Sequence, residues 1–297
     1  MAWRAKWTKS LRVSAKVVCI GNLTAGGTGK TPVAIAIGEV LRTRGLKVAF
    51  LSRGFGGRER GPLLVDTARH GAADVGDEPL LLAGVAPTIV SRDRRAGAKL
   101  AVAQGADVIV MDDGHQNFDL VKDLSIVVID SENPCGNGHV LPAGPLRESV
   151  AQGMTRADAV VLVGTGRKWS KREIVPTLRA RMKSEPSRDL GGRRLLAFAG
   201  IGQPVRFFES VEAQGALLVD TKAFADHHAY RADEISKLKS AARANNADLI
   251  TTEKDYVRLA PADREDVESL PVVAVFEDNE SLALLLEKFE LGTRPET

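Results

Sequence analysis

A glycine-rich segment near the start of the sequence reads Gly21-Asn22-Leu23-Thr24-Ala25-Gly26-Gly27-Thr28-Gly29-Lys30-Thr31-Pro32. It follows a short apolar run, Lys16 to Ile20, and it precedes a stretch with helical character that ends before Gly45. Small residues in unusual dihedral angles let several backbone N–H groups point at phosphate oxygens. A lysine then neutralises phosphate charge, and the hydroxyl after it ligates Mg²⁺. The segment therefore predicts a phosphate-binding loop between a strand and a helix.

The residues expected to hold the phosphates are Thr24, Ala25, Gly26, Gly27, Thr28, Gly29, Lys30 and Thr31. One position departs from the strict motif, because Thr24 stands where a glycine is expected five residues before Gly29. The alternative is a glycine-rich turn in another kind of α/β protein. The intact Gly-Lys-Thr sequence, between a strand and a helix whose N-terminal end attracts anions, favours the phosphate loop.

The rest of the chain alternates between apolar runs and helix-compatible stretches. Apolar runs in the first part include Leu46–Ser52, Thr88–Ser91, Val108–Met111, Ile126–Asp130 and Ala159–Val163. Nearly continuous apolar runs indicate strands buried on both faces, as in a parallel sheet. We therefore expect an α/β fold of the P-loop NTPase type, with a mostly parallel sheet and helices on both faces. A smaller C-terminal α/β lobe is expected after it.

A polar stretch, residues 183–194, divides the alternating pattern. We expect a short basic N-terminal segment (1–16), a nucleotide-binding lobe (17–190) and a smaller α/β lobe (191–297). Apolar runs in the last part include Leu195–Ala199, Ala216–Val219, Asp248–Thr252 and Val272–Phe276.

Composition excludes several classes of protein. The 297 residues are 44% hydrophobic and 27% charged, which is neither a disordered nor a fibrous composition. Two cysteines form no disulfide framework, and this indicates a reducing compartment. We expect no transmembrane helix, because no run of 18 apolar residues occurs. We expect no signal peptide, because the first apolar stretch is followed by a glycine-rich loop and not by a cleavage site. A net charge of +3 is too small to indicate a nucleic-acid partner by itself.

Two adjacent carboxylates, Asp112 and Asp113, follow the apolar run that ends at Met111. Open α/β sheets bind ligands at the carboxyl ends of their strands, and a phosphate loop needs a carboxylate near its metal. The alternative is that Asp112 caps the following turn and that Asp113 is solvated. The phosphate loop favours Mg²⁺ binding.

Two further polar clusters are ambiguous from the residues alone. Asp77 and Glu78 precede a short apolar helix, where a helix cap is the ordinary role of an aspartate. His227 stands between Asp226 and His228, and a carboxylate beside an imidazole suits proton transfer. Surface histidines in a loop are the alternative. The residues themselves favour the structural role in both clusters.

Eight motifs, taken in order, resemble the tetraacyldisaccharide 4′-kinase family of lipid A biosynthesis. They occupy residues 21–32, 52–56, 76–82, 112–116, 141–148, 198–202, 224–228 and 251–258. The family has threonine at the position of Thr24. The resemblance implies two α/β lobes with ATP and Mg²⁺ between them, the smaller lobe closing over the site. It also implies transfer of the γ-phosphoryl group to the 4′-hydroxyl of a tetraacylated glucosamine disaccharide 1-phosphate.

The resemblance also implies residue roles, by matching positions. Asp77 takes the proton of the hydroxyl and is paired with His227. The resemblance therefore replaces the structural roles favoured above for these two clusters by catalytic ones. The expected catalytic set is Asp77, His227, Lys30 and Asp113. The expected neighbours of the metal are Thr31, Asp112, Asp113 and Glu148. The expected substrate neighbours are Glu78, Arg94, Gln116 and Arg147.

Two features depart from the family pattern. Asn117 replaces a histidine, and His115 occupies a variable position where it would have to compensate. The N-terminal segment is shorter than usual, but Trp3, Trp7 and Leu11 fall on one face of a helix among several cations. Such a segment suits peripheral contact with the cytoplasmic face of the inner membrane, the alternative being a frayed tail. No protein partner is indicated.

Two other functions compete with the kinase. A regulatory ATPase explains the phosphate loop and Asp112, but it leaves Asp77 and His227 without a role. A nucleic-acid binder rests only on the basic N-terminal residues.

Overall fold

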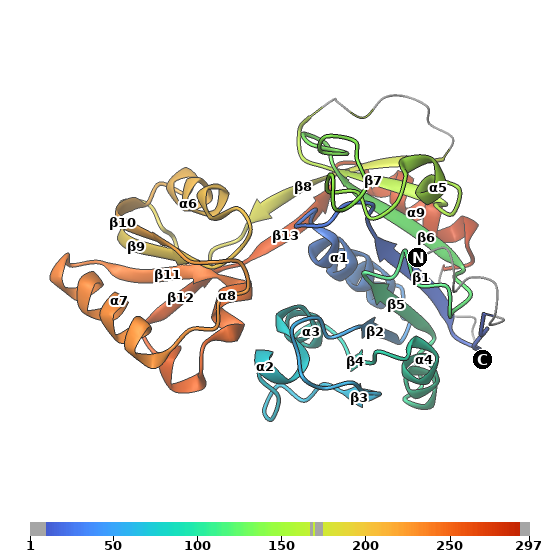
Figure 1. The fold of residues 1–297 in the computed structure, drawn as a ribbon, viewed down its shortest axis with the longest axis horizontal. Coiled ribbons are helices and arrows are strands. Elements are labelled where there is room, and N and C mark those ends of the chain that lie inside the picture. The colour runs from blue at the N-terminus through green and yellow to red at the C-terminus, as the bar shows by residue number, and fades with distance from the viewer. Residues whose placement is uncertain (1–9, 167–168, 170–174, 292–297) are drawn as a thin grey trace.

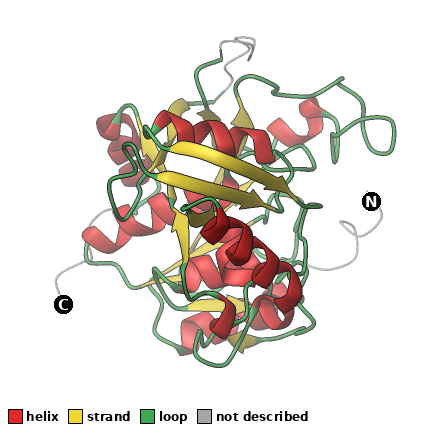
Figure 2. Ribbon diagram, turned by 90° about the vertical axis from the view of Figure 1, so that its left-hand side faces the viewer, coloured by secondary structure: helices red, strands yellow, loops and turns green. Residues whose placement is uncertain are grey.

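The computed structural model describes residues 10–166, 169 and 175–291, and every structural statement below concerns these residues. They form two sheets with helices on either side of the strands (Figures 1 and 2). Trp3 and Trp7 of the predicted amphipathic face lie outside the described residues. Leu11 forms a β-bridge with Leu120 and no helical turn, which corrects its assignment to a helix face.

The larger sheet has nine strands in the described part of the chain, in the order β13-β8-β7-β6-β1-β5-β2-β4-β3. The strands are β1 (Lys16–Gly21), β2 (Val48–Ser52), β3 (Leu63–Leu64), β4 (Thr88–Val90), β5 (Val108–Asp112), β6 (Leu124–Asp130), β7 (Ala159–Val163), β8 (Thr177–Ser184) and β13 (Val272–Phe276). Only the β3–β4 and β8–β13 pairs within this described sheet are antiparallel. The predicted mostly parallel sheet is confirmed.

Helices cover both faces of this sheet. They are α1 (Lys30–Thr43), α2 (Ala72–Val75), α3 (Asp77–Ala83), α4 (Arg94–Ala103), α5 (Val150–Met154) and α9 (Asn279–Lys288). Helix α1 buries Val33, Ile37 and Leu41 at helical spacing against one face, in a core that α9 completes. Helix α4 packs its alanines on the other face, against Ile109 and Met111.

The smaller sheet has four parallel strands among the described residues, in the order β10-β9-β11-β12. Its elements are β9 (Arg194–Ala199), α6 (Pro204–Ala213), β10 (Leu217–Ala223), α7 (Ala232–Ala244), β11 (Asp248–Thr252), α8 (Glu253–Arg258), a 3₁₀ turn (Pro261–Asp263) and β12 (Val267–Leu270). Phe198 and Leu249 are buried between this sheet and α7. The second α/β lobe is therefore built around a core of its own.

The end of the chain corrects the predicted division at residue 190. Strand β13 pairs with β8 at the edge of the larger sheet, and α9 packs on that sheet, although both were assigned to residues 191–297. Figure 1 shows β8 and β13 side by side, reaching toward the smaller sheet. Strand β8 was not predicted because it alternates polar and apolar residues, whereas the other strands of this sheet were predicted from continuous apolar runs.

The order of the strands brings the candidate site residues together. Strand β1 lies between β5 and β6, and Ile20 is in register with Asp112. The glycine-rich loop therefore leaves β1 beside the end of β5, where the paired aspartates lie. The carboxyl edge of a parallel sheet is where such folds bind ligands.

Candidate active site

The glycine-rich loop is open where a phosphate would lie. A Cβ atom added at Gly26 or Gly27 would meet no atom within 4 Å among the described residues. Gly29 precedes α1 in a left-handed conformation (φ 83°), and no side chain caps the helix there. The first N–H groups of α1 are thus left for a ligand, and a helix N-terminus attracts anions. The loop geometry fits the predicted phosphate site.

A second segment braces this loop from outside. The backbone N–H of Ala25 donates to the Pro145 carbonyl (2.7 Å), and that of Arg147 donates to the Leu23 carbonyl (2.7 Å). Asn22 supports the loop from within, because its Nδ2 donates to Thr28 Oγ1 (3.1 Å). The conformation of the loop is therefore held by neighbours on both sides.

Asp112 is buried at the end of β5, with 1% of its surface exposed. Its Oδ2 accepts a hydrogen bond from Thr31 Oγ1 (3.0 Å), but its Oδ1 is buried and has no hydrogen-bond partner among the described residues. Burial and the nearby charge of Glu78 raise the pKa of Asp112 to about 7. A buried carboxylate oxygen without a hydrogen-bond donor is suited to bind a cation, so these residues fit Mg²⁺. The alternative role of Asp112, capping the following turn, does not match this geometry.

Asp113 lies next to two cations. Its Oδ1 accepts from Arg147 Nη1 (2.8 Å) and lies 4.0 Å from Lys30 Nζ. The Asp113 backbone has a positive φ of 51°, which turns its side chain away from the direction of β5 toward these cations. The predicted residues Lys30, Asp113 and Arg147 therefore form one cluster beside the loop.

Glu148 was expected near the metal, but its contacts do not support that role. Its two carboxylate oxygens accept from Arg156 Nη2 (2.5 and 2.6 Å), and Oε1 also accepts from Gln116 Nε2 (3.0 Å). Burial opposes ionisation of Glu148, but the hydrogen bonds from Arg156 and Gln116 outweigh it and lower its pKa. Gln116 in turn donates to the Asn22 carbonyl (2.9 Å). Glu148 thus orients Gln116 against the start of the loop.

Asp77 is the first residue of α3, after Gly76 at the N-cap, and 4% of its surface is exposed. Its Oδ1 accepts from the backbone N–H of Glu78 (2.9 Å). Its Oδ2 accepts from Nε (3.0 Å) and Nη2 of Arg258, on α8 of the smaller lobe. Burial works against ionisation, but Arg258 and Lys254 outweigh it, so the pKa of Asp77 lies below its ordinary value. The helix-cap role is not observed.

His227 reaches Asp77 from the smaller lobe. Its Nδ1 lies 3.5 Å from Asp77 Oδ2, and the edge of its ring faces Phe55 at a centroid distance of 5.6 Å. The His227 backbone is left-handed (φ 57°) and its N–H donates to the Gly200 carbonyl (3.1 Å). The neighbouring His228 has a structural role, because it stacks on Phe224 and bonds Glu234. The structure thus brings together the predicted pair.

The other two predicted substrate neighbours are engaged with protein groups. Glu78 forms an ion pair with Lys254 Nζ of α8 (2.8 Å). Arg94 is buried and donates to the Ser91 carbonyl (2.7 Å). Burial, together with the charge of Arg53, lowers the pKa of Arg94 to about 10.

Comparisons with known proteins agree on one family. A family model described as tetraacyldisaccharide-1-P 4′-kinase matches residues 1–290. A tetraacyldisaccharide 4′-kinase of Gluconacetobacter diazotrophicus is 52% identical over 271 residues, which are 90% of this chain and 83% of the relative. One of Hyphomonas neptunium is 49% identical over 299 residues, which are 99% of this chain and 90% of the relative. The chain belongs to the tetraacyldisaccharide-1-P 4′-kinase family.

A solved structure of the family has the same fold. LpxK from Aquifex aeolicus, crystallised with ATP, superimposes with a TM-score of 0.73 at 26% identity, over 95% of this chain and 91% of that chain. The family resemblance and the α/β fold predicted from the motifs are confirmed. The protein is therefore a phosphotransferase, a kinase of lipid A biosynthesis.

The two departures at residues 115 and 117 have a structural explanation. His115 is fully buried, and its ring nitrogens face Ser125 Oγ (3.3 Å) and the Gly153 carbonyl (3.0 Å). Burial lowers the pKa of His115 to about 4, so the ring is neutral. Asn117 bonds Asp119. In the described residues the His115 ring bonds groups of the core and no residue of the phosphate loop, so His115 supports the core.

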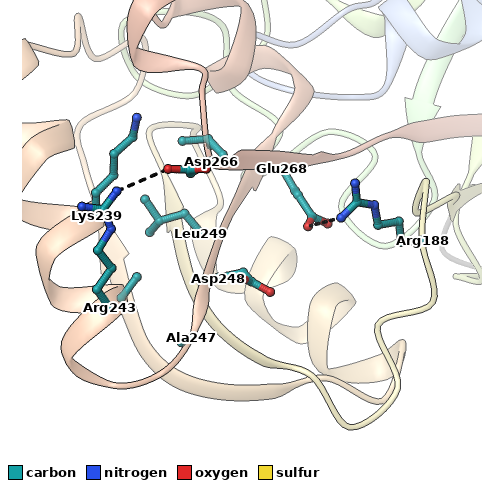
Figure 3. Close-up of a pocket in the computed structure, with 10 residues that line it drawn as sticks. Arg188, Lys239, Arg243, Ala247, Asp248, Leu249, Asp266 and Glu268 are labelled. Carbon is teal, nitrogen blue, oxygen red and sulfur yellow. Dashed lines mark hydrogen bonds and ion pairs between the residues drawn. The ribbon is translucent and has the colours of Figure 1, made fainter.

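A cavity of about 530 Å³ lies elsewhere, between α7 and the β11–β12 edge of the smaller sheet (Figure 3). It is lined by charges of both signs, and the cations Arg243 and Arg188 face Asp266 and Glu268. None of the predicted site residues lines it. It does not contribute to the site of the kinase.

Sequence analysis missed Arg258 and Lys254 as site residues. Both stand in the last of the eight motifs, residues 251–258, to which the sequence assigned no site role. Thr252 is the N-cap of α8. The spacing of Lys254 and Arg258 was the signal that could have found them. Cations four residues apart lie on one face of a helix, where they can pair with two adjacent carboxylates such as Asp77 and Glu78.

Proposed function

We propose that the protein transfers the γ-phosphoryl group of ATP to the 4′-hydroxyl of a tetraacylated glucosamine disaccharide 1-phosphate. The observation that carries this proposal is the Asp77–His227 pair, 3.5 Å apart and contributed by two lobes. A carboxylate and an imidazole at this position suit the removal of a proton from an acceptor hydroxyl. The activity for which the relatives are named and the ATP in the Aquifex aeolicus structure support the same substrates.

The phosphates of ATP are assigned to the glycine-rich loop. Residues 24–31 supply backbone N–H groups and the N-terminal end of α1, and Lys30 supplies a positive charge. Arg147, which contacts Asp113, is placed to neutralise charge on the transferred group. Such preorganised donors stabilise charge that develops in the transition state.

Thr31 and Asp112 would hold Mg²⁺, with Asp113 beside them. The orphaned Oδ1 of Asp112 supports this assignment. When bound, Mg²⁺ neutralises phosphate charge and orients the phosphates for in-line transfer. Glu148 is left out of the proposed ligand set because Arg156 and Gln116 occupy its oxygens.

Asp77 and His227 are proposed to receive the proton of the 4′-hydroxyl as a pair. The lowered pKa of Asp77 keeps this carboxylate ionised at neutral pH, so it is ready to accept a hydrogen bond from the hydroxyl. An imidazole beside a carboxylate shares the proton as transfer proceeds. Because the pair forms only where the two lobes meet, closure around the substrate would also exclude water.

The substrate requires a membrane surface, because four acyl chains are not presented from water. We propose peripheral contact with the cytoplasmic face of the inner membrane, through the basic N-terminal residues. None of the described helices combines the length and apolar character needed to cross a bilayer. Salt-dependent binding to anionic vesicles, weakened when Trp3 and Trp7 are replaced, would test this contact.

The test of the function is transfer of labelled γ-phosphate from ATP·Mg²⁺ to a tetraacyl disaccharide 1-phosphate in detergent micelles. Wild type, Lys30→Ala and His227→Ala are compared, with Lys237→Ala as a matched control, because Lys237 is an exposed lysine on α7. We expect product from wild type and the control and little from the other two variants. Steady ATP hydrolysis without labelled lipid would contradict the kinase assignment and favour the regulatory ATPase.

A further inference from the structure

Helix α8 of the smaller lobe contacts the first turn of α3 through two ion pairs. Arg258 binds Asp77, and Lys254, one turn earlier on α8, binds Glu78. We propose that Arg258 is a positioning residue, an inference that rests on the proposed role of Asp77. Arg258 fixes the carboxylate of Asp77 and its distance to His227, and so the Asp77–His227 pair is assembled when the two lobes meet.

The contacts of Arg258 use its whole guanidinium group. Nε and Nη2 both donate to Oδ2 of Asp77, and Nη1 donates to the Gly200 carbonyl (2.7 Å) and to Asp255 Oδ1 (3.0 Å). Only 6% of the Arg258 side chain is exposed, against 4% for Asp77. A planar group with this many bonds has one orientation, which a flexible surface arginine lacks.

Asp255 holds Arg258 from behind. It is fully buried, and its Oδ1 also accepts from the Gly200 N–H (3.0 Å) and the Tyr230 hydroxyl (2.9 Å). Its Oδ2 accepts from Thr252 Oγ1 (2.7 Å). Arg258 is therefore anchored to the frame of the smaller lobe before it reaches Asp77, which lies 181 positions away in the sequence.

His227 shares this anchor. The Gly200 carbonyl accepts from the His227 N–H (3.1 Å) as well as from Arg258. Arg258 Nη2 also lies 3.3 Å from His227 Nδ1. The guanidinium of Arg258 thus contacts both Asp77 and His227, and the Gly200 carbonyl binds both Arg258 and His227. A residue that only joined the lobes would need neither contact.

The charge of Arg258 has a measurable consequence. The groups that face Asp77 are Arg258, Lys254 and His227 from the smaller lobe, with Glu78 beside it on α3. Because Arg258 is the strongest of the groups that lower the pKa of Asp77, its removal raises that pKa. Activity depends on the ionised carboxylate, so the acidic limb of the pH profile then moves to higher pH.

The test measures kcat and kcat/KM against pH for Arg258→Met and Arg258→Lys in the full-length enzyme. We expect kcat of the methionine variant to fall on the order of 100-fold, with the acidic limb at higher pH, while ATP binding is retained. The lysine variant restores the positive charge but lacks the paired N–H donors of the guanidinium. The acidic limb of its pH profile therefore returns toward that of wild type while kcat stays low. Arg243→Met is the matched control, because Arg243 is exposed and pairs only with exposed Asp266 in the described contacts.

An acidic limb unchanged in both variants would overturn the proposal, even if the thermal midpoint falls, because a purely structural role lowers stability without moving the limb. Wild-type kcat in Arg258→Met would overturn it as well. These failures differ from failure of the proposed function, in which wild type itself transfers no phosphate to the lipid.

Discussion

The phosphate end of the larger lobe and the contact between the lobes are built in different ways. The phosphate end consists of consecutive residues after β1, and the groups proposed there to bind phosphate and metal are mainly backbone N–H groups and two residues at the end of the adjacent strand. The lobe contact consists of side chains from α3, residue 227 and α8, which meet only through tertiary structure. The first region is therefore determined locally, whereas the second depends on how two separate cores sit together.

The largest expected effect separates nucleotide binding from phosphoryl transfer. Asp77→Ala should lower kcat by about 10³- to 10⁴-fold while the Kd for ATP stays within a factor of about two, because Asp77 serves the acceptor side. Lys30→Ala should lower kcat and also weaken ATP binding. Calorimetric titration with ATP measures the affinity of both variants, and initial-rate measurements give their kcat. Equal loss of ATP affinity in both variants would mean that the two regions are not independent.

The second effect concerns the larger lobe alone, through the pH dependence of its stability at the buried His115. The folded protein keeps His115 neutral down to about pH 4, whereas the unfolded chain takes up a proton near pH 6.5. The unfolded state therefore binds more protons between these values, and the free energy of unfolding falls as the pH falls from about 6.5 to about 4. The expected loss is about 3 kcal/mol.

Urea unfolding at a series of pH values measures this loss, with His115→Gln as the comparison. Glutamine keeps a polar side chain beside Ser125 but does not titrate. The slope of the free energy of unfolding against pH, between about pH 4 and 6.5, should therefore fall by the equivalent of about one bound proton. An identical slope in both proteins would show that other groups carry the acid sensitivity.

The third effect tests the metal site. Asp112→Asn keeps the size of the side chain but removes its charge, so the Mg²⁺ concentration for half-maximal activity should rise about 10- to 100-fold. Activity measured over a Mg²⁺ series, after removal of metal by chelation, checks this. Asp220→Asn, the same change at an exposed aspartate of β10 in the smaller lobe, serves as a control for net charge. An unchanged Mg²⁺ requirement would remove Asp112 from the ligand set.

The smallest effect concerns the outer of the two ion pairs between the lobes. Lys254 and Glu78 keep 32% and 23% of their side-chain surfaces exposed, so their interaction is screened by solvent. A double-mutant cycle with Lys254→Met and Glu78→Gln should give a coupling free energy of about 1 kcal/mol or less. A coupling of several kcal/mol would mean that this pair, and not the inner one, holds the lobes together.

Prediction from sequence succeeded where the chemistry is local. The Gly-Lys-Thr sequence after an apolar run predicted the loop, and the end of the apolar run Val108–Met111 predicted Asp112 and Asp113 as its neighbours. Arg258 was not found, because its partner is 181 positions away and a cation near a helix end has many ordinary roles. The metal role expected of Glu148 failed to gain support for a similar reason, since Arg156 is brought to it by the α5 turn.

The return of the chain to the larger sheet has a consequence for protein engineering. Val272 is the antiparallel partner of Ser184, so the whole smaller lobe is inserted where a β-hairpin would otherwise turn. Replacing residues 185–271 by a two-residue Asn-Gly turn should close that hairpin and keep the edge strand and α9 in place. The resulting minimal domain would retain the phosphate loop while lacking His227 and Arg258, whereas simple truncation at residue 190 would strip part of its hydrophobic core.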